Sequence, residues 1–218
     1  MQKLSFSGKN EGPLKALFLG AHSDDIELGC GGTVLRLVED GQDLDIYWVV
    51  FAASPLRRTE AESSANAFLG KVGKKEIIIK NFKESFFPYV GSEIKGYFED
   101  LKRVVTPDVV FTHFQHDLHQ DHRVISELTW NTFRDHLILE YEVVKYDGDL
   151  GHPNVFVHLS KEIIGRKSKL LVDHFKSQLA HHWFTEDTFR AILRLRGIES
   201  NAPDKYAEAF YSRKIVLG

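Results

Sequence analysis

Short apolar runs alternate along the chain with segments whose apolar residues recur at helical spacing. The first run, residues 14–20 (LKALFLG), ends in glycine and is typical of a strand buried on both faces of a sheet. Residues 33–40 (TVLRLVED) follow with apolar residues three and four positions apart, and Gly41 is a common helix stop. The pattern therefore predicts a strand followed by a helix.

The same alternation continues toward the C-terminus. Further strands are predicted at 44–51, 76–82, 108–112, 139–146, 154–159 and 207–216. Helices are predicted at 58–69, 92–105, 121–134 and 161–179, with Ser92 as the cap of the second of these. Strands that alternate with helices imply βαβ units, so we predict an α/β fold with a mainly parallel sheet, in one domain spanning 1–218.

This architecture predicts where ligands bind. In doubly wound sheets they lie beyond the carboxyl ends of the strands, where the strand order reverses. Residues 21–32 and 113–122 each directly follow a buried apolar run. We therefore expect these two loops to meet on one rim of the sheet, although about 100 residues separate them.

Composition narrows the class of protein. Hydrophobic residues make up 43% and charged residues 27%, as in ordinary globular proteins, and the net charge of −3 gives no general attraction to nucleic acid. Cys30 is the one cysteine, and no apolar run approaches the ~20 residues that span a bilayer. We expect a cytoplasmic protein with no nucleic-acid partner and no membrane span. The oligomeric state stays open, and a homo-oligomer is compatible with the sequence.

The first loop, AHSDDIE at 21–27, places four ionisable side chains directly after an apolar strand. Burying the adjacent carboxylates of Asp24 and Asp25 is unfavourable unless a cation or hydrogen bonds compensate. A divalent metal would bind one carboxylate and leave the other free as a base. The alternative is that one aspartate caps the helix and His22 is an ordinary buried histidine. The glycines at 29–32 lack the spacing of a phosphate-binding loop.

The second loop, THFQHDLHQDHR at 112–123, contains four histidines. His119 and His122 are the stronger candidates because Asp121 lies between them and can orient an imidazole through its second nitrogen. For His113 and His116 we favour ordinary loop histidines that bond to the backbone.

Together the two loops can form a catalytic zinc site, which usually has three protein ligands and one position for water. His22, Asp25 and His122 would supply the ligands. Asp24 would then remove a proton from the water, and His119 would donate to the oxyanion on the attacked carbonyl. A His₂Asp set suits zinc, with iron, manganese and cobalt as alternatives.

These residues resemble the LmbE-like or PIG-L de-N-acetylases. The family motif AHPDDxE is similar to residues 21–27, and the motif HxDH is similar to residues 119–122. The chain departs from the family at Ser23 and Gln120, where proline is common. Softer similarity extends to three later stretches, which are PNVFV at 153–157, KSQ at 176–178 and YAEAF at 206–210.

The resemblance implies a Rossmann-like α/β fold with helices on both faces of the sheet. It assigns three metal ligands, which are His22, Asp25 and His122. It also implies that Asp24 is the general base, and that His119, oriented by Asp121, stabilises the oxyanion or acts as an acid. The implied substrate is a small N-acetylated amino sugar or sugar conjugate. An amidase acting on another small amide, such as a thiol conjugate, and a binding module without turnover are the alternatives.

Arginines near both loops are candidates for contact with the substrate. Arg57 and Arg58 follow the second strand, and Arg123 follows the HxDH stretch. A guanidinium suits recognition of phosphate or carboxylate groups. Pairing of the first two with glutamates on the same helix is an equal alternative. Trp183, with His181 and His182 beside it, could form a lid or wall of the site, but its position next to Phe184 favours core packing.

Overall fold

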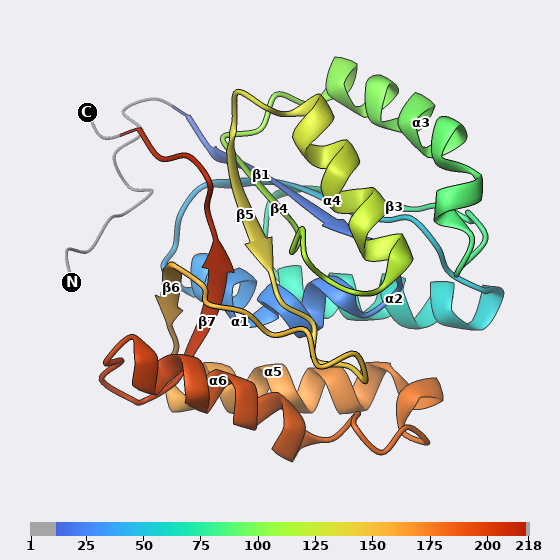
Figure 1. Cartoon of the computed structure of the whole chain (residues 1–218). Coiled ribbons are helices and arrows are strands. Elements are labelled where there is room, and N and C mark those ends of the chain that lie inside the picture. The colour runs from blue at the N-terminus through green and yellow to red at the C-terminus, as the bar shows by residue number, and fades with distance from the viewer. Residues whose placement is uncertain (1–11, 217–218) are drawn as a thin grey trace.

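The structure, a computed structural model, describes residues 12–216 and is built on a seven-stranded sheet with the order β3-β2-β1-β4-β5-β7-β6 (Figure 1). The strands are β1 (Leu14–Gly20), β2 (Leu44–Val50), β3 (Lys74–Ile79), β4 (Val109–His113), β5 (Leu137–Tyr141), β6 (Val155–His158) and β7 (Ala207–Tyr211). The first five strands are parallel, and β7 runs antiparallel between β5 and β6.

Helices cover both faces of this sheet (Figure 1). They are α1 (Asp25–Glu39), α2 (Pro55–Leu69), α3 (Gly91–Val104), α4 (Gln120–Thr132), α5 (Lys161–His174) and α6 (Glu186–Glu199), with short 3₁₀ helices η2 (Phe87–Tyr89) and η3 (Lys176–Gln178). Helices α3 and α4 pack on one face, whereas α1 and α2 pack on the other, with α5 and α6 beyond them. The predicted α/β fold with a mainly parallel sheet and helices on both faces is confirmed.

Strand β1 is central in the sheet, and it has apolar side chains on both faces of the sheet. Ala16 and Phe18 belong to the core on one side of the sheet, and Leu17 and Leu19 belong to the core on the other. Strand β1 pairs with β2 on one side and β4 on the other, and the strand order reverses between β1 and β4. Their carboxyl ends therefore border the crevice where such folds bind ligands.

Helix α1 begins eight residues earlier than the sequence pattern predicts, and a kink at Cys30 (φ −141°, ψ 16°) separates its two halves. The kink frees backbone groups, and a buried ion pair satisfies them. Glu208 on β7 accepts from the N–H groups of Gly32 (2.7 Å) and Thr33 (2.6 Å). Lys167 on α5 donates to Leu28 O (2.7 Å) and to the Glu208 carboxylate (2.7 Å). The C-terminal strand thus holds the helix that follows the first loop.

Other boundaries also differ from the sequence pattern. Helix α3 begins at Gly91, so Ser92 lies inside it and is not its cap. The predicted helix at 161–179 divides into α5 and η3, and the predicted strands at 139–146 and 207–216 end at Tyr141 and Tyr211. Helix α6 was not predicted, although the Thr185 side chain caps it by accepting from the N–H of Thr188. No helix among residues 12–216 is long and apolar enough to cross a membrane.

Candidate metal and catalytic site

The two loops expected to converge do meet at the carboxyl ends of β1 and β4. His113, the last residue of β4, accepts a hydrogen bond at Nε2 from the backbone N–H of Ala21, at 2.9 Å. The His113 side chain is fully buried, and its ring stacks on that of His122 with centroids 3.9 Å apart. This contact joins the strand ends directly, and the predicted bond of His113 to the backbone is present. The expectation of an ordinary loop histidine is wrong, because His113 is a buried strand residue whose Nε2 lies 3.3 Å from Asp25 Oδ2.

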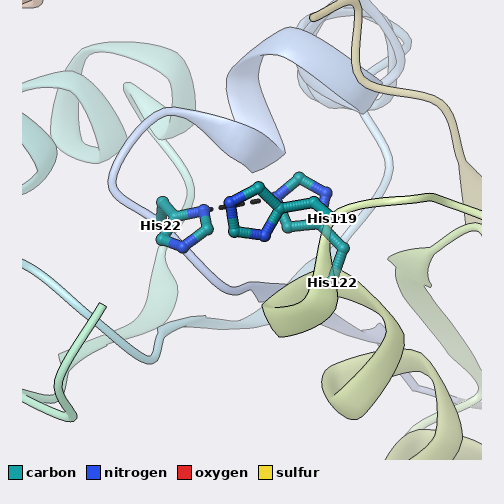
Figure 2. A group of neighbouring side chains, drawn as sticks. All are labelled: His22, His119 and His122. Atoms are coloured by element: carbon teal, nitrogen blue, oxygen red, sulfur yellow. Dashed lines mark hydrogen bonds between the residues drawn. The ribbon is translucent and has the colours of Figure 1, made fainter. Parts of the chain in front are cut away.

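Three donor atoms from the two loops lie at nearly equal separations. His22 Nδ1 is 3.2 Å from His122 Nε2 and 3.4 Å from Asp25 Oδ2, and the last two atoms are 3.5 Å apart. Figure 2 shows His22 facing the imidazoles of His119 and His122. Two ligands in a tetrahedral zinc site, each at 2.0–2.1 Å from the ion, are about 3.3 Å apart. The spacing of these donors therefore fits zinc.

Other side chains near this point are less available as ligands. His22, His119 and His122 form one group that could hold a metal ion, and Asp25, His113 and His122 form a second. However, the Nε2 lone pair of His113 accepts from Ala21, and the Nδ1 lone pair of His119 accepts from the backbone N–H of Asp121 at 3.2 Å. The set best placed for a metal is therefore His22, Asp25 and His122.

The electrostatics of this set favour a cation. Burial opposes protonation of His22, but the carboxylates of Asp25 and Asp121 outweigh it and raise the pKa of His22 to about 10. Burial and the neighbouring His113 lower the pKa of His122 to about 3. Burial would raise the pKa of Asp25, but the surrounding histidines hold it well below its usual range. A divalent cation can replace the proton that the carboxylates stabilise.

Asp121 supports a different imidazole from the one expected. Its carboxylate accepts from His22 Nε2 (3.0 Å) and from the backbone N–H groups of Ser85 (2.6 Å) and Phe87 (3.1 Å). The sequence-based expectation that Asp121 orients His119 through its side chain is therefore corrected. The backbone N–H of Asp121 fixes His119 instead, because His119 is the N-terminal cap of α4. The loop containing Ser85, which has a positive φ of 67°, becomes part of the site.

Asp117 plays the same role for the second imidazole, and sequence reasoning missed it. His122 Nδ1 donates to Asp117 Oδ2 at 2.9 Å, and Lys145 Nζ lies 3.0 Å from the same oxygen. Burial would raise the pKa of Asp117, but His122 and the positive charge of Lys145 hold it well below its usual range. Carboxylates that accept from the outer nitrogen of a histidine orient its other nitrogen toward a metal. The sequence feature that could have identified Asp117 is its position within the histidine-rich stretch at 112–123.

We predict that Asp117→Asn weakens binding of zinc by about 10- to 100-fold, because the His122 imidazole loses its charged hydrogen-bond acceptor. Competition for zinc with a chromophoric chelator would measure the change. Asp149→Asn is the matched control, since Asp149 also contacts Lys145 but makes no hydrogen bond to His122. Equal zinc affinities of Asp117→Asn and the unmodified protein would contradict this role.

Asp24 lies beside the donor set but is held by another partner. Its carboxylate is buried, and Arg57 Nη2 donates to Asp24 Oδ1 at 2.6 Å. Burial raises the pKa of Asp24 even though Arg57 opposes the shift. A carboxylate with a raised pKa that remains outside the donor set is suited to accept a proton.

His119 presents a hydrogen-bond donor. Because its Nδ1 accepts from the backbone of α4, the neutral imidazole carries its proton on Nε2. Partial burial and the nearby His22 lower the pKa of His119, which keeps it neutral. His119 lines the cavity described below, so it can donate to a carbonyl oxygen bound there.

Of the three arginines, Arg57 alone lines the cavity. Arg58 Nη2 donates to the carbonyl of Ile79 (2.6 Å) at the end of β3, and Arg123 donates to the carbonyl of Leu118. Arg58 also lies 3.7 Å from Glu62 on the same helix, so the alternative pairing occurs for this arginine. Contact of Arg58 and Arg123 with substrate stays a prediction. The ion-pair partner of Arg57 is Asp24 and not a glutamate of its own helix.

A cavity of about 310 Å³ opens over the site. Its floor includes the donor set, Asp24 and His119, and its outer part is formed by segments that follow β5 and α5. The lining residues of that outer part are Val143, Lys145, Tyr146, Asp147, Gln178, His181 and Trp183. The volume suits a small molecule of one or two rings.

Comparison with known proteins agrees with the motifs. Residues 17–133 match the model of the family described as PIG-L, GlcNAc-PI de-N-acetylase. The chain is 31% identical over 139 residues to the uncharacterized deacetylase YaiS of Escherichia coli K12, which covers 57% of this chain and 69% of that protein.

Solved structures of similar fold include enzymes of more than one kind. N,N'-diacetylchitobiose deacetylase from Pyrococcus horikoshii has a TM-score of 0.66 and 22% identity, over 91% of this chain and 83% of that one. GalB, the 4-carboxy-2-hydroxymuconate hydratase of Pseudomonas putida KT2440, has a TM-score of 0.73 and 15% identity, over 94% of this chain and 98% of that one. These two likenesses show the fold alone.

Proposed function

Because the chain belongs to the PIG-L family of GlcNAc-PI de-N-acetylases, we propose that it is a zinc-dependent hydrolase that removes the N-acetyl group from an amino sugar or sugar conjugate. A hydratase shares the fold, so the fold does not select the reaction. The observation that carries the proposal is the triangle of donor atoms with edges of 3.2, 3.4 and 3.5 Å, beside the buried Asp24.

In this proposal the metal ligands are His22, Asp25 and His122. Bound there, a zinc ion would act as a Lewis acid that lowers the pKa of water and polarises the acetyl carbonyl. His22 donates its Nε2–H to Asp121, and His122 donates its Nδ1–H to Asp117. The lone pairs on His22 Nδ1 and His122 Nε2 therefore remain free to bind the metal. Iron, manganese or cobalt would accept the same donors, so the metal is part of the test.

The chain's own residues would then handle the proton and the developing charge. Asp24 accepts the proton of the attacking water, and Arg57 holds the carboxylate in position from its other side. His119 donates its Nε2 proton in a hydrogen bond to the oxyanion of the tetrahedral intermediate. Either Asp24 or His119 can deliver the proton to the leaving amine.

A metal analysis combined with a screen of acetate release tests this function. The screen would cover N-acetylated amino sugars, their conjugates, and other small amides that include thiol conjugates. We expect acetate and a free amine in equal amounts from at least one N-acetyl sugar, with loss of turnover on chelation and recovery with zinc. Cleavage of other amides with no acetyl-sugar hydrolysis would overturn the deacetylase proposal in favour of an amidase.

A further inference from the structure

The two carboxylates that support the imidazole ligands differ in the charge of their other hydrogen-bond donors. Asp121 accepts from His22 and from two backbone N–H groups, and no lysine or arginine pairs with it among residues 12–216. Asp117 accepts from His122 and from one backbone N–H at 2.8 Å, but its Oδ2 also lies 3.0 Å from Lys145 Nζ. The chain of contacts behind His122 therefore ends in a cation, and the one behind His22 does not.

Lys145 is held against Asp117 by its own segment of chain. Its side chain is 10% exposed, in the segment that follows β5 and lines the cavity. The ammonium group also forms an ion pair with Asp149, four residues further along, and the Asp149 carboxylate accepts from the backbone N–H of Leu118 at 2.7 Å. The ammonium group is therefore fixed between two carboxylates, one of which supports a proposed metal ligand.

Burial allows the charge of Lys145 to act on the ligand. The side chains of Asp117 and Asp149 are 3% and 7% exposed, so little water screens the interaction. A carboxylate that accepts from the outer nitrogen of an imidazole makes that imidazole a more basic ligand. A cation bonded to the same carboxylate oxygen draws charge away from the hydrogen bond. Lys145 should therefore reduce the effect of Asp117 on His122.

Two simpler roles for Lys145 fit the contacts less well. As a site for an anionic substrate it is poorly suited, because two aspartates pair with its ammonium group and Asp147 Oδ2 lies 3.8 Å from it. As a purely structural tie it is not required, because the bond from Leu118 N–H to Asp149 already joins the two segments. Neither role needs the ammonium group to contact the oxygen that accepts from His122.

We propose that Lys145 is a positioning residue for the metal site, whose positive charge acts through Asp117 to limit how strongly His122 binds the metal. This inference rests on the proposed function, because the zinc ion is part of that proposal. A ligand that donates less charge leaves more positive charge on the ion, which then polarises a carbonyl more strongly. Lys145 thus lowers the affinity for zinc and favours its chemistry.

The zinc affinity of the full chain, measured by competition with a chromophoric chelator, tests this role. Lys145→Gln removes the charge, while its amide can still donate to Asp117. We expect zinc to bind roughly 3- to 10-fold more tightly than in the unmodified protein, because the carboxylate keeps its full charge for His122. A purely structural role predicts the opposite sign, since a loosened segment would weaken the site. Equal or weaker zinc binding by folded Lys145→Gln would overturn the proposal.

Matched variants separate the charge from general effects. Lys145→Arg keeps the positive charge and should keep the affinity of the unmodified protein. Lys169→Gln removes a lysine on α5 that is 74% exposed and pairs with Asp173, and it should leave zinc binding unchanged. If Lys145→Gln does not fold, Asp149→Asn is added to it, which removes one buried charge of each sign. Zinc should then bind more tightly than in Asp149→Asn alone.

A double-variant cycle tests whether Lys145 acts through Asp117. In the Asp117→Asn background, Lys145→Gln should change the zinc affinity by less than about twofold, because the charged carboxylate between lysine and imidazole is absent. A gain as large as in the unmodified background would show that the charge acts on the metal directly. That result would overturn the route through Asp117.

The imidazoles give a readout that needs neither turnover nor a substrate. NMR of isotope-labelled histidines in the zinc-loaded protein follows the Nδ1–H signal of His122. We expect this signal to move downfield in Lys145→Gln, because a carboxylate without a paired cation is a stronger acceptor. The Nε2–H signal of His22, which bonds to Asp121, should stay in place. An unmoved His122 signal would contradict the proposal.

Three results separate this inference from the proposed function. Tighter zinc binding in Lys145→Gln without acetate release from any N-acetyl sugar would support the role of Lys145 and refute the deacetylase. Acetate release by the unmodified protein with unchanged zinc affinity in Lys145→Gln would support the deacetylase and overturn the role of Lys145. An unmodified protein that binds no zinc would overturn both.

Discussion

Asp24→Asn should lower kcat for acetate release by roughly 10²- to 10⁴-fold, the usual contribution of a general base, while the protein keeps its zinc. Asparagine has the same shape, and its amide oxygen can still accept the hydrogen bond from Arg57. It cannot accept a proton from water. Because Asp24 lies outside the donor set of His22, Asp25 and His122, the substitution removes proton transfer without removing a ligand.

The measurement needs zinc content and turnover from the same sample. Asp100→Asn is a suitable control, because Asp100 is exposed on α3 and pairs with Arg103 on the same helix. We expect this control to keep both zinc and full turnover. A near-normal rate in zinc-loaded Asp24→Asn would show that another group takes the proton.

His122→Ala should remove both zinc and activity. His122 belongs to both groups of side chains that could hold a metal ion, and its Nε2 completes the triangle with His22 and Asp25. Loss of a ligand should exceed the roughly 10- to 100-fold loss of affinity typical for removing a supporting hydrogen bond. Turnover should fall to the background level, because the chemistry depends on the cation.

His116→Ala is the matched control for this prediction. His116 comes from the same loop, but it is exposed and its ring nitrogen bonds to the neighbouring Gln115. Zinc titration and acetate release should be unchanged in this variant. Stoichiometric zinc in His122→Ala would refute the proposed ligand set and leave the other donors of the loops to be considered.

Much of the fold could be predicted because its signals are local. The run at 14–20 is apolar in both directions, as a central parallel strand requires, and β1 has the predicted bounds. Convergence of the two loops followed from the rule for parallel sheets, and the contact of His113 with Ala21 confirms it. Helix α6 was missed even though Thr185 and the apolar spacing of Phe189 and Leu193 signal it.

Partners of long polar side chains could not be predicted, because they depend on how loops fold in space. The Asp117 carboxylate contacts His122 because the chain between the two residues turns into α4. Asp121 lies next to His122 in sequence, yet its carboxylate bonds to His22, 99 residues away. Arg58 likewise reaches a carbonyl at the end of β3. Sequence spacing gives the residue types at such a site but not which group each one supports.

The bond between Glu208 and the kinked helix α1 has a consequence for how the enzyme is made. All three proposed ligands lie in the first 122 residues. The N–H groups of Gly32 and Thr33, in the middle of α1, instead bond to Glu208, which lies 176 and 175 residues further along the sequence. The side chains that support His22, Asp24 and His122 lie within the first 121 residues, whereas the middle of the helix that follows the first loop depends on a residue of β7. We expect the middle of α1 to become ordered only when β7 inserts between β5 and β6.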